Sequence, residues 1–456
     1  MLYKMKILKF FFSLNAAFLS MGINSAQNPL ITNIYTADPA AHQFSDGKLY
    51  LYADYDPRGE NSGWLNMFKY HVYSTSDLKV WTDHGSLFDC KDITWNDGAA
   101  WDGDCVEAKG KYYYYFPMVD KIGVMVADSP IGPFTDVLGK PLITRQTPGV
   151  LNKASGWLTS PCILFYKDTA YMYMGQNEEF YVIKLKKNML ETDGPAITLK
   201  KPKHFHEAAW VNYAHGKFHA TYGGNDGTGK DKLGYAVADN PYGPFEFQYF
   251  IQNEQAATVQ NCITEFNGQP ILFYHQNGPD DYHRQICAEK FSYTADGKIP
   301  YISRTAEGLG KTELCLEACG KHEAEDYQKT SWGIETIFEP AGEGNHVVNV
   351  LGDNTWILFG KVGFGKGVKT FETMLSSPRK VNEGAIEIRI DNPKGQLIGT
   401  CPIPKTSGWF EWGKAICNID QNISGVHDVY FVFRGYTEKG FHYRVNYMMD
   451  YFRFGK

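Results

Sequence analysis

The sequence has no apolar run of 18 residues and no run rich in lysine and arginine. The first absence argues against a membrane span. The second, with a formal net charge of -6, argues against the phosphate-neutralising surface that nucleic-acid binding requires. Helical periodicity is also scarce, whereas aromatic residues make up 15% of the chain. Because aromatic side chains favour strands, we expect an all-β protein.

The nine cysteines form no CxxC pair and no cluster with histidine, which argues against a zinc site. Their odd number leaves at least one thiol free. Cys401 and Cys417 flank a turn and could meet across two strands, and the others are expected to be small buried hydrophobes. We expect no organic cofactor.

Residues 1–26 have the three-part layout of a secretory signal peptide. Lys4, Lys6 and Lys9 precede an apolar stretch, Phe10 to Ile23, and the small-residue site Asn24-Ser25-Ala26 follows. The stretch is too short to span a bilayer, and the alternative is an apolar first helix. We therefore expect cleavage after Ala26 and a secreted or periplasmic protein.

A phrase recurs between residue 47 and about residue 300: a turn with Gly or Asp, then a run of alternating aromatic residues. The copies begin at Gly47, Gly110, Asp168, Gly216 and Gly268. Their spacing of about 50 to 60 residues is the blade period of a β-propeller, so five copies predict five blades. The alternative is a β-sandwich with incidental turn similarity.

The pattern changes after Thr305 to a charged stretch and then to short alternating strands. We predict a five-bladed β-propeller over residues 27–305, a linker over 306–319, and a β-sandwich of jelly-roll type over 320–456.

Two carboxyl groups stand where a propeller places its active site, at the starts of strands around the axis. Asp38 lies among small apolar neighbours just before the first aromatic repeat, and its plain alternative is an Asp-Pro turn. Glu207 is flanked by Phe, Ala and Trp, which should make it hold its proton more tightly, as a general acid requires. A separation of about 6.5–9.5 Å would indicate hydrolysis with inversion.

Residues 28–304 resemble glycoside hydrolase family 43. The matching motifs are Ala37-Asp38-Pro39-Ala40, the segment from Trp101 to Tyr113, the phrase Ala127 to Phe134, and Glu207-Ala208-Ala209-Trp210. The resemblance implies a five-bladed propeller that hydrolyses β-xylosides or α-L-arabinofuranosides by inversion, with Asp38 as general base and Glu207 as general acid. It also implies that Arg284 touches the bound sugar. Trp101 and Trp210 are further candidates for substrate binding.

The sequence departs from this family at the third carboxylate, which orients the acid and raises its pKa. Ser160 stands at that position. Asp102 and Asp104 lie in an altered box nearby, and we expect Asp102 to compensate. The His pair that can serve a metal at the axis is replaced by Gln260-Asn261.

Residues 320–456 resemble carbohydrate-binding module family 6, with matches at His322 to Tyr327, Ser407 to Trp412 and Asp450 to Phe454. The resemblance implies a structural calcium held by Glu323, Glu325 and Asp450, oxygen ligands that suit this ion. Trp409 matches the Trp on which sugar stacks. The partner aromatic and amide positions are Val350 and Met448, so this cleft is altered.

The sequence therefore predicts a glycosidase of the β-xylosidase or α-L-arabinofuranosidase type, acting on plant cell-wall polysaccharide or oligosaccharide. Two alternatives stay open. One is a catalytically weak glycan-binding propeller protein, motivated by Ser160. The other is a sibling propeller family that acts on fructans or by phosphorolysis.

Overall fold

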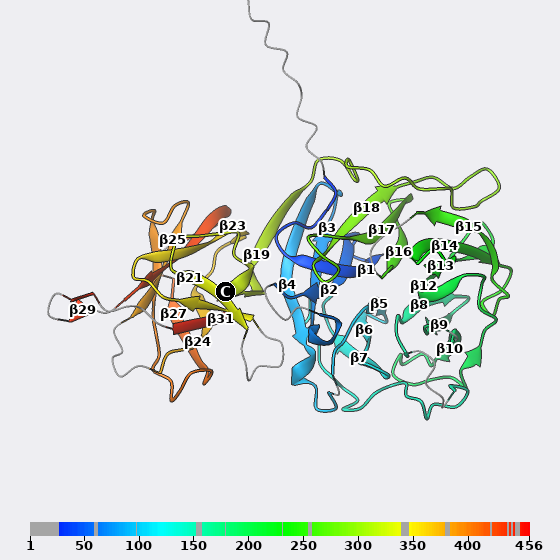
Figure 1. Ribbon diagram of the computed structural model, residues 1–456, viewed down its shortest axis with the longest axis horizontal. Coiled ribbons are helices and arrows are strands. Elements are labelled where there is room, and N and C mark those ends of the chain that lie inside the picture. Colours follow the sequence, from blue (N-terminus) through cyan, green and yellow to red (C-terminus); the bar gives the residue numbers. More distant parts are fainter. Residues whose placement is uncertain are drawn as a thin grey trace, which may run out of the picture.

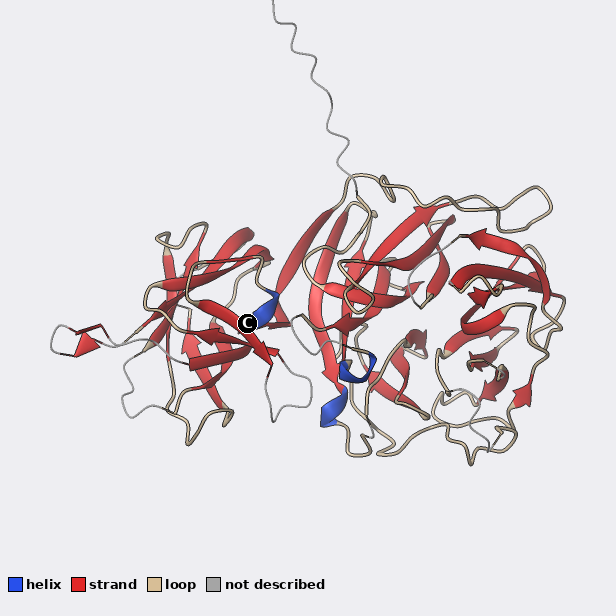
Figure 2. Cartoon of the chain, in the orientation of Figure 1, coloured by secondary structure: helices blue, strands red, loops and turns tan. Residues whose placement is uncertain are grey.

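The computed structural model describes residues 27–58, 63–96, 98–151, 157–177, 179–229, 231–253, 258–338, 346–378, 384–419, 422–435, 437–438, 441–442 and 447–456. The predicted signal peptide lies outside these residues. The described part is all-β apart from three 3-10 turns, η1 (Trp64–Asn66), η2 (Cys90–Asp92) and η3 (Ala324–Asp326) (Figure 2). It contains no helix long and apolar enough to cross a membrane.

The N-terminal region consists of five antiparallel groups of three or four strands. The first group is β1 (Tyr35–Gln43), β2 (Leu49–Asp56), β3 (Lys69–Thr75) and β4 (Val80–Asp89). The second is β5 (Asp104–Ala108), β6 (Lys111–Pro117) and β7 (Ile122–Ala127). The third is β8 (Cys162–Tyr166), β9 (Thr169–Met174), β10 (Tyr181–Leu185) and β11 (Ile197–Thr198). The fourth is β12 (Phe205–Ala214), β13 (Lys217–Asn225), β14 (Asp231–Ala238) and β15 (Glu246–Gln252), and the fifth is β16 (Asn261–Phe266), β17 (Gln269–Asn277) and β18 (Arg284–Lys290).

The first strands of these five groups lie next to one another. β1 contacts β5, β5 contacts β8, β8 contacts β12, β12 contacts β16, and β16 contacts β1. The groups are held together by buried aromatic and aliphatic side chains, such as Tyr52, Tyr114, Tyr173 and Tyr222. The starts of the five inner strands therefore come together around one axis, which positions the residues described below.

The buried apolar residues of the C-terminal region form one core cluster, with members from two sets of paired strands. One set contains β20 (Lys329–Thr330), β23 (Thr355–Gly363), β25 (Ala385–Ile390), β26 (Leu397–Pro402) and β28 (Val426–Arg434). The other contains β21 (Ile334–Phe338), β22 (His346–Val350), β24 (Thr370–Ser376), β27 (Gly413–Asn418) and β31 (Tyr447–Gly455). The short strands β29 (Thr437–Glu438) and β30 (Phe441–His442) pair only with each other among the described residues.

Strand β19 (Glu313–Glu323) joins the two regions. Its first residues pair in parallel with β4 and with β23, and its last two pair with β31. Residues 306–319, expected as a linker, thus include the first half of a strand. Figure 1 shows β19 between β4 on one side and β23 on the other.

All nine cysteines lie in the described residues. Cys401 on β26 and Cys417 on β27 are near enough to interact as thiols, as the turn between them led us to expect.

Candidate active site

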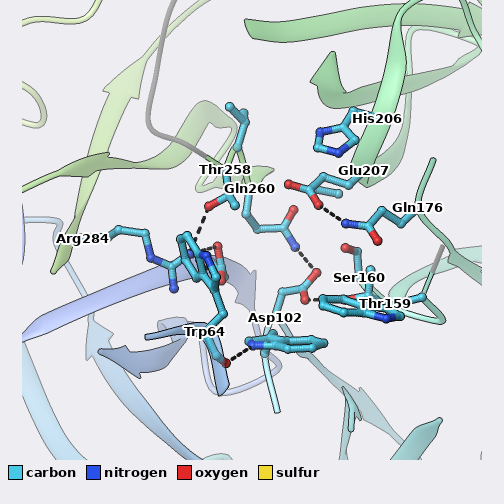
Figure 3. Close-up of a pocket in the computed structure, with 15 residues that line it drawn as sticks. Trp64, Asp102, Thr159, Ser160, Gln176, His206, Glu207, Thr258, Gln260 and Arg284 are labelled. Atoms are coloured by element: carbon cyan, nitrogen blue, oxygen red, sulfur yellow. Dashed lines mark hydrogen bonds and ion pairs between the residues drawn. The ribbon is translucent and has the colours of Figure 1, made fainter. Parts of the chain in front are cut away.

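A pocket of about 220 Å³ lies where the inner strands begin (Figure 3). Its lining comes from strands of the first, fourth and fifth groups and from segments outside the strands: Asp38, Trp64, Trp101, Asp102, Trp157, Thr159, Ser160, Gln176, His206, Glu207, Ala208, Thr258, Val259, Gln260 and Arg284. The two predicted catalytic carboxyl groups therefore share one cavity. Glu207 and Arg284 stand on opposite sides of it in Figure 3.

Asp38 occupies a bulge in β1, where the register with β2 shifts between Ala37 and Ala40. Its backbone φ is 51°, an unfavourable value for a residue with a side chain. A bulge re-aims a side chain that regular alternation would point elsewhere. The local strain thus turns the buried Asp38 carboxylate into the pocket.

Positive charge surrounds the Asp38 carboxylate. Nη1 of Arg284 lies 3.1 Å from its Oδ1 and 3.0 Å from its Oδ2, and Nδ1 of His275 lies 3.0 Å from Oδ1. Burial alone would raise the pKa of Asp38, but Arg284 and His275 outweigh it and hold this pKa below its ordinary value. Asp38 is therefore an ionised carboxylate, as a general base must be.

Arg284, which begins β18, is itself held by side chains of β2. Its guanidinium donates to Asp56 at 2.8 and 3.0 Å and to Asp54 at 3.3 Å, and it lies 5.0 Å from the ring of Trp64. The side chain is fully buried. These contacts fix the guanidinium against Asp38, so the predicted sugar-contacting arginine also sets the charge of the base.

Glu207 lies between two irregularities of β12, where the register with β13 shifts on both sides of it. Its Oε2 accepts a hydrogen bond of 2.7 Å from Nε2 of Gln176. Burial raises the pKa of Glu207, and the charges of Asp231 and Asp38 add to this, against the lowering effect of His206 and Gln176. The environment of Glu207 thus favours the protonated form, opposite to that of Asp38.

Asp102 also lines the pocket, in a buried position. Thr159 donates to its Oδ1 at 2.9 Å, and Gln260 donates to its Oδ2 at 2.8 Å. Burial raises the pKa of Asp102 well above its ordinary value, and the charges of Asp38 and Glu207 act in the same direction. A third carboxyl group therefore stands in the pocket beside Ser160, although Ser160 itself has none.

Two predicted site residues do not line this pocket. Asp104 accepts hydrogen bonds of 2.7 Å from His42 and from the backbone of Ile163, so it ties three inner strands together. Trp210 donates to the carbonyl of Ile263 at 2.8 Å and faces a different cavity. Neither Asp104 nor Trp210 therefore contributes its side chain to the wall of this pocket.

Three tryptophans form one wall of the pocket. Trp101, a predicted binding residue, donates its indole N–H to the carbonyl of Trp64 at 2.7 Å. Its ring stacks on Trp157 with centroids 4.7 Å apart and an angle of 14°. Trp157 is 41% exposed, so an apolar ring face is available to a sugar. Sequence reasoning missed Trp64, Trp157 and Gln176, which come from loops outside the repeats.

Among the described residues, the cluster able to offer three metal-binding atoms is His206, Glu207 and Asp231. Nδ1 of His206 and Oδ2 of Asp231 are 2.5 Å apart and satisfy each other directly. The predicted calcium ligands Glu323, Glu325 and Asp450 do not form such a cluster within the described part of the chain. Instead, Nζ of Lys69 lies 2.9 Å from Oε2 of Glu323. A lysine ammonium thus lies beside one of the carboxylates that the sequence predicted as calcium ligands.

Trp409 lies in the loop between β26 and β27 and is 42% exposed. Val350 and Met448, at the altered cleft positions, are buried and offer neither a ring nor an amide. The structure thus leaves Trp409 available at the surface without the two partners that the resemblance associates with it.

Two carboxyl groups in one pocket walled by tryptophan, one with a lowered pKa and one with a raised pKa, form the machinery of a glycosidase. Residues 26–299 match the family described as Glycosyl hydrolases family 43, and residues 323–456 match Carbohydrate binding module (family 6). The chain belongs to glycosyl hydrolase family 43, whose fold is a propeller, and it is a glycosidase.

Curated relatives cover either the whole chain or its N-terminal part. An arabinoxylan arabinofuranohydrolase of Bacillus subtilis is 30% identical, over 90% of this chain and 89% of its own length. A xylosidase/arabinosidase of Bacteroides ovatus is 32% identical, over 59% of this chain and 95% of its own.

Solved structures show the same two extents. An arabinoxylan arabinofuranohydrolase from Bacillus subtilis, in complex with cellotetraose, matches with a TM-score of 0.57 and 26% identity, over 95% of this chain and 98% of its own. An α-L-arabinofuranosidase from Clostridium thermocellum matches with a TM-score of 0.54 and 33% identity, over 62% of this chain and 99% of its own.

Proposed function

We propose that this protein is an inverting glycosidase that removes α-L-arabinofuranosyl or β-xylosyl units from arabinoxylan or its oligosaccharides. The observation that carries the mechanism is the opposite environment of Asp38 and Glu207 in one pocket. The names of relatives at 30–32% identity support the sugar class.

In the proposed reaction, Asp38 accepts a proton from a water molecule as that water attacks the anomeric carbon. Glu207 gives its proton to the departing glycosidic oxygen on the other side of the sugar. Arg284 keeps Asp38 ionised before the reaction. Asp102 takes the role of the third carboxyl group, and the charge of an ionised Glu207 raises the pKa of Asp102.

The wider organisation follows from the same proposal. The five strand groups act as five blades around the pocket, over residues 27–305, and residues 320–456 form a jelly-roll sandwich. Trp409 gives this second domain an exposed ring for glycan contact. Residues 1–26 direct export, so the enzyme meets its polysaccharide outside the cell or in the periplasm.

The test uses the leaving group. Glu207→Gln removes the acid, so turnover of arabinoxylan should fall by about 10²-fold or more. An aryl arabinofuranoside or xyloside with an acidic phenol should lose much less, because its leaving group needs little protonation. Asp38→Asn should lose activity on both kinds of substrate.

Glu107→Gln, a carboxyl-to-amide change outside the pocket, is the control. Equal losses of Glu207→Gln on both kinds of substrate would contradict the acid assignment. Binding of arabinoxylan by the wild type, with no sugar released from any aryl glycoside, would favour the glycan-binding alternative.

A further inference from the structure

The acidic turn at the start of the C-terminal module is buried against the first strand group of the catalytic domain. The turn consists of Glu323 and the 3-10 turn η3, and its three carboxyl groups, on Glu323, Glu325 and Asp326, are all buried. Carboxylates are rarely buried without a partner, because desolvation of a charge is costly. The partners should therefore be identifiable in the structure.

The first partner is Lys69, which begins β3 and is only 7% exposed. Its Nζ lies 2.9 Å from Oε2 of Glu323. Lys69 and Glu325 line the same small cavity, and Lys69 also interacts electrostatically with Asp450. The ammonium of Lys69 thus lies among all three carboxylates that were predicted to hold calcium.

The space around Lys69 suits an ammonium better than a hydrated metal ion. The cavity that Lys69 and Glu325 share is about 10 Å³, roughly the volume that one water needs. Calcium takes about six to eight oxygen ligands at about 2.3–2.6 Å. The ion pair between Lys69 and Glu323 would have to break before Glu323 could supply one of them.

The rest of the turn has partners on the same strand group. The hydroxyl of Tyr55 donates to Oδ1 of Asp326 at 3.1 Å, and Nε of Arg58 lies 3.7 Å from that oxygen. Nη1 of Arg58 donates to the carbonyl of Tyr327 at 3.4 Å. The catalytic domain therefore supplies partners to the end of the turn, at Asp326 and Tyr327, as well as Lys69 to its start.

We propose that the ammonium of Lys69 takes the place of a calcium ion in the module. The acidic turn then docks the module onto the catalytic domain instead of binding metal. A lysine from one domain in contact with a buried carboxylate of the other favours the docked arrangement, because each charge is buried only together with its partner.

The test is thermal unfolding of the full chain with millimolar calcium or with EDTA. The wild type should unfold at the same temperature in both. Lys69→Met should lower the unfolding temperature by roughly 5–10 °C in EDTA, since it leaves the buried Glu323 with only the more distant ammonium of Lys321, at 4.0 Å. Calcium should then recover part of this loss, because the vacated carboxylates are free to bind it.

Lys111→Met is the control, since Lys111 pairs with Asp128 at an exposed site. It should change little in either condition. A Lys69→Met protein as stable as this control, or one that is destabilised and does not respond to calcium, would overturn the proposal.

Calorimetric titration of the wild type with calcium does not depend on how well any variant folds. We expect the wild type to show no calcium binding that is lost when Glu325 is replaced by Gln. Calcium binding by the wild type that is lost in Glu325→Gln would overturn it. Turnover of aryl glycosides below the unfolding temperature should be the same in wild type and Lys69→Met, which separates this test from that of the catalytic residues.

Discussion

Gln176 provides a direct way to shift the pKa of the proposed acid. Its side-chain N–H donates to Glu207 at 2.7 Å, a bond that favours the ionised carboxylate and so lowers the pKa of Glu207. Gln176→Leu removes the donor and keeps most of the side-chain volume. The pKa of Glu207 should therefore rise in this variant.

The size of the rise can be estimated from this single bond. A hydrogen bond to a charged group contributes about 1.5–3 kcal/mol, and one pKa unit corresponds to about 1.4 kcal/mol. Because the pocket holds enough space for water to replace part of the bond, we expect a rise of about 1 unit. A general acid acts only while protonated, so a higher pKa of Glu207 extends activity to higher pH.

The assay is the pH dependence of kcat/KM on a xyloside or arabinofuranoside with a poor leaving group. The basic limb of this profile should move upward in Gln176→Leu. Gln260→Leu is the matched control, because Gln260 donates to Asp102 at 2.8 Å and has no hydrogen bond to Glu207. A basic limb that stays in place or moves downward in Gln176→Leu, or that moves equally in the control, would refute the reasoning.

Three further substitutions test other parts of the pocket. Asp102→Asn removes a carboxyl group whose ionisation and that of Glu207 disfavour each other, so the basic limb should move to lower pH by up to about 1 unit; an unchanged pH profile would exclude Asp102 as the third carboxyl group. Trp157→Ala removes the exposed stacking surface, so KM for an oligosaccharide should rise about 3- to 10-fold with little change in kcat, and a loss in kcat alone would contradict a binding role. Arg284→Lys keeps the charge but loses the planar contact with Asp38, so the pKa of Asp38 should rise. The acidic limb of the pH profile should therefore move to higher pH. An acidic limb at its wild-type position would contradict the role of Arg284 in keeping Asp38 ionised.

Much of the fold could be predicted from the sequence because each strand group contains the same local sequence pattern between its first two strands. A Gly or Asp turn followed by alternating aromatics recurs in all five groups, and the observed inner hairpins contain these turns at Gly47, Gly110, Asp168, Gly216 and Gly268. Local patterns of this kind depend only on neighbouring residues. The pairing of β19 with β4 depends on contacts between distant segments, so the linker prediction could not anticipate it.

The site was predictable only in part. Asp38 and Glu207 lie within recognisable motifs. Asp102 was identified as a carboxylate in a motif that departs from the family's usual form. Asp104 and Trp210 lie close to them in sequence but face elsewhere. The register of β12 shifts between Glu207 and Trp210, and Asp102 precedes the strand that begins at Asp104, so a period of two cannot be counted across either pair.

Other functional contacts have no local signal at all. Trp64 and Trp157 come from loops, whose conformation is set by the packing of several strand groups. Lys69 meets Glu323 only because two separately folded regions come together. Sequence spacing carries no information about such contacts between distant segments.

In the proposed mechanism, Asp38 activates a water that displaces the leaving group in one step while Glu207 protonates the departing oxygen. Proton NMR of the first sugar released, recorded before the free sugar equilibrates, tests this most directly. Because a single displacement inverts the anomeric carbon, we expect the anomer opposite to that of the substrate: α-xylose from a β-xyloside, or β-L-arabinofuranose from an α-L-arabinofuranoside. First release of the anomer with the substrate's own configuration would contradict it.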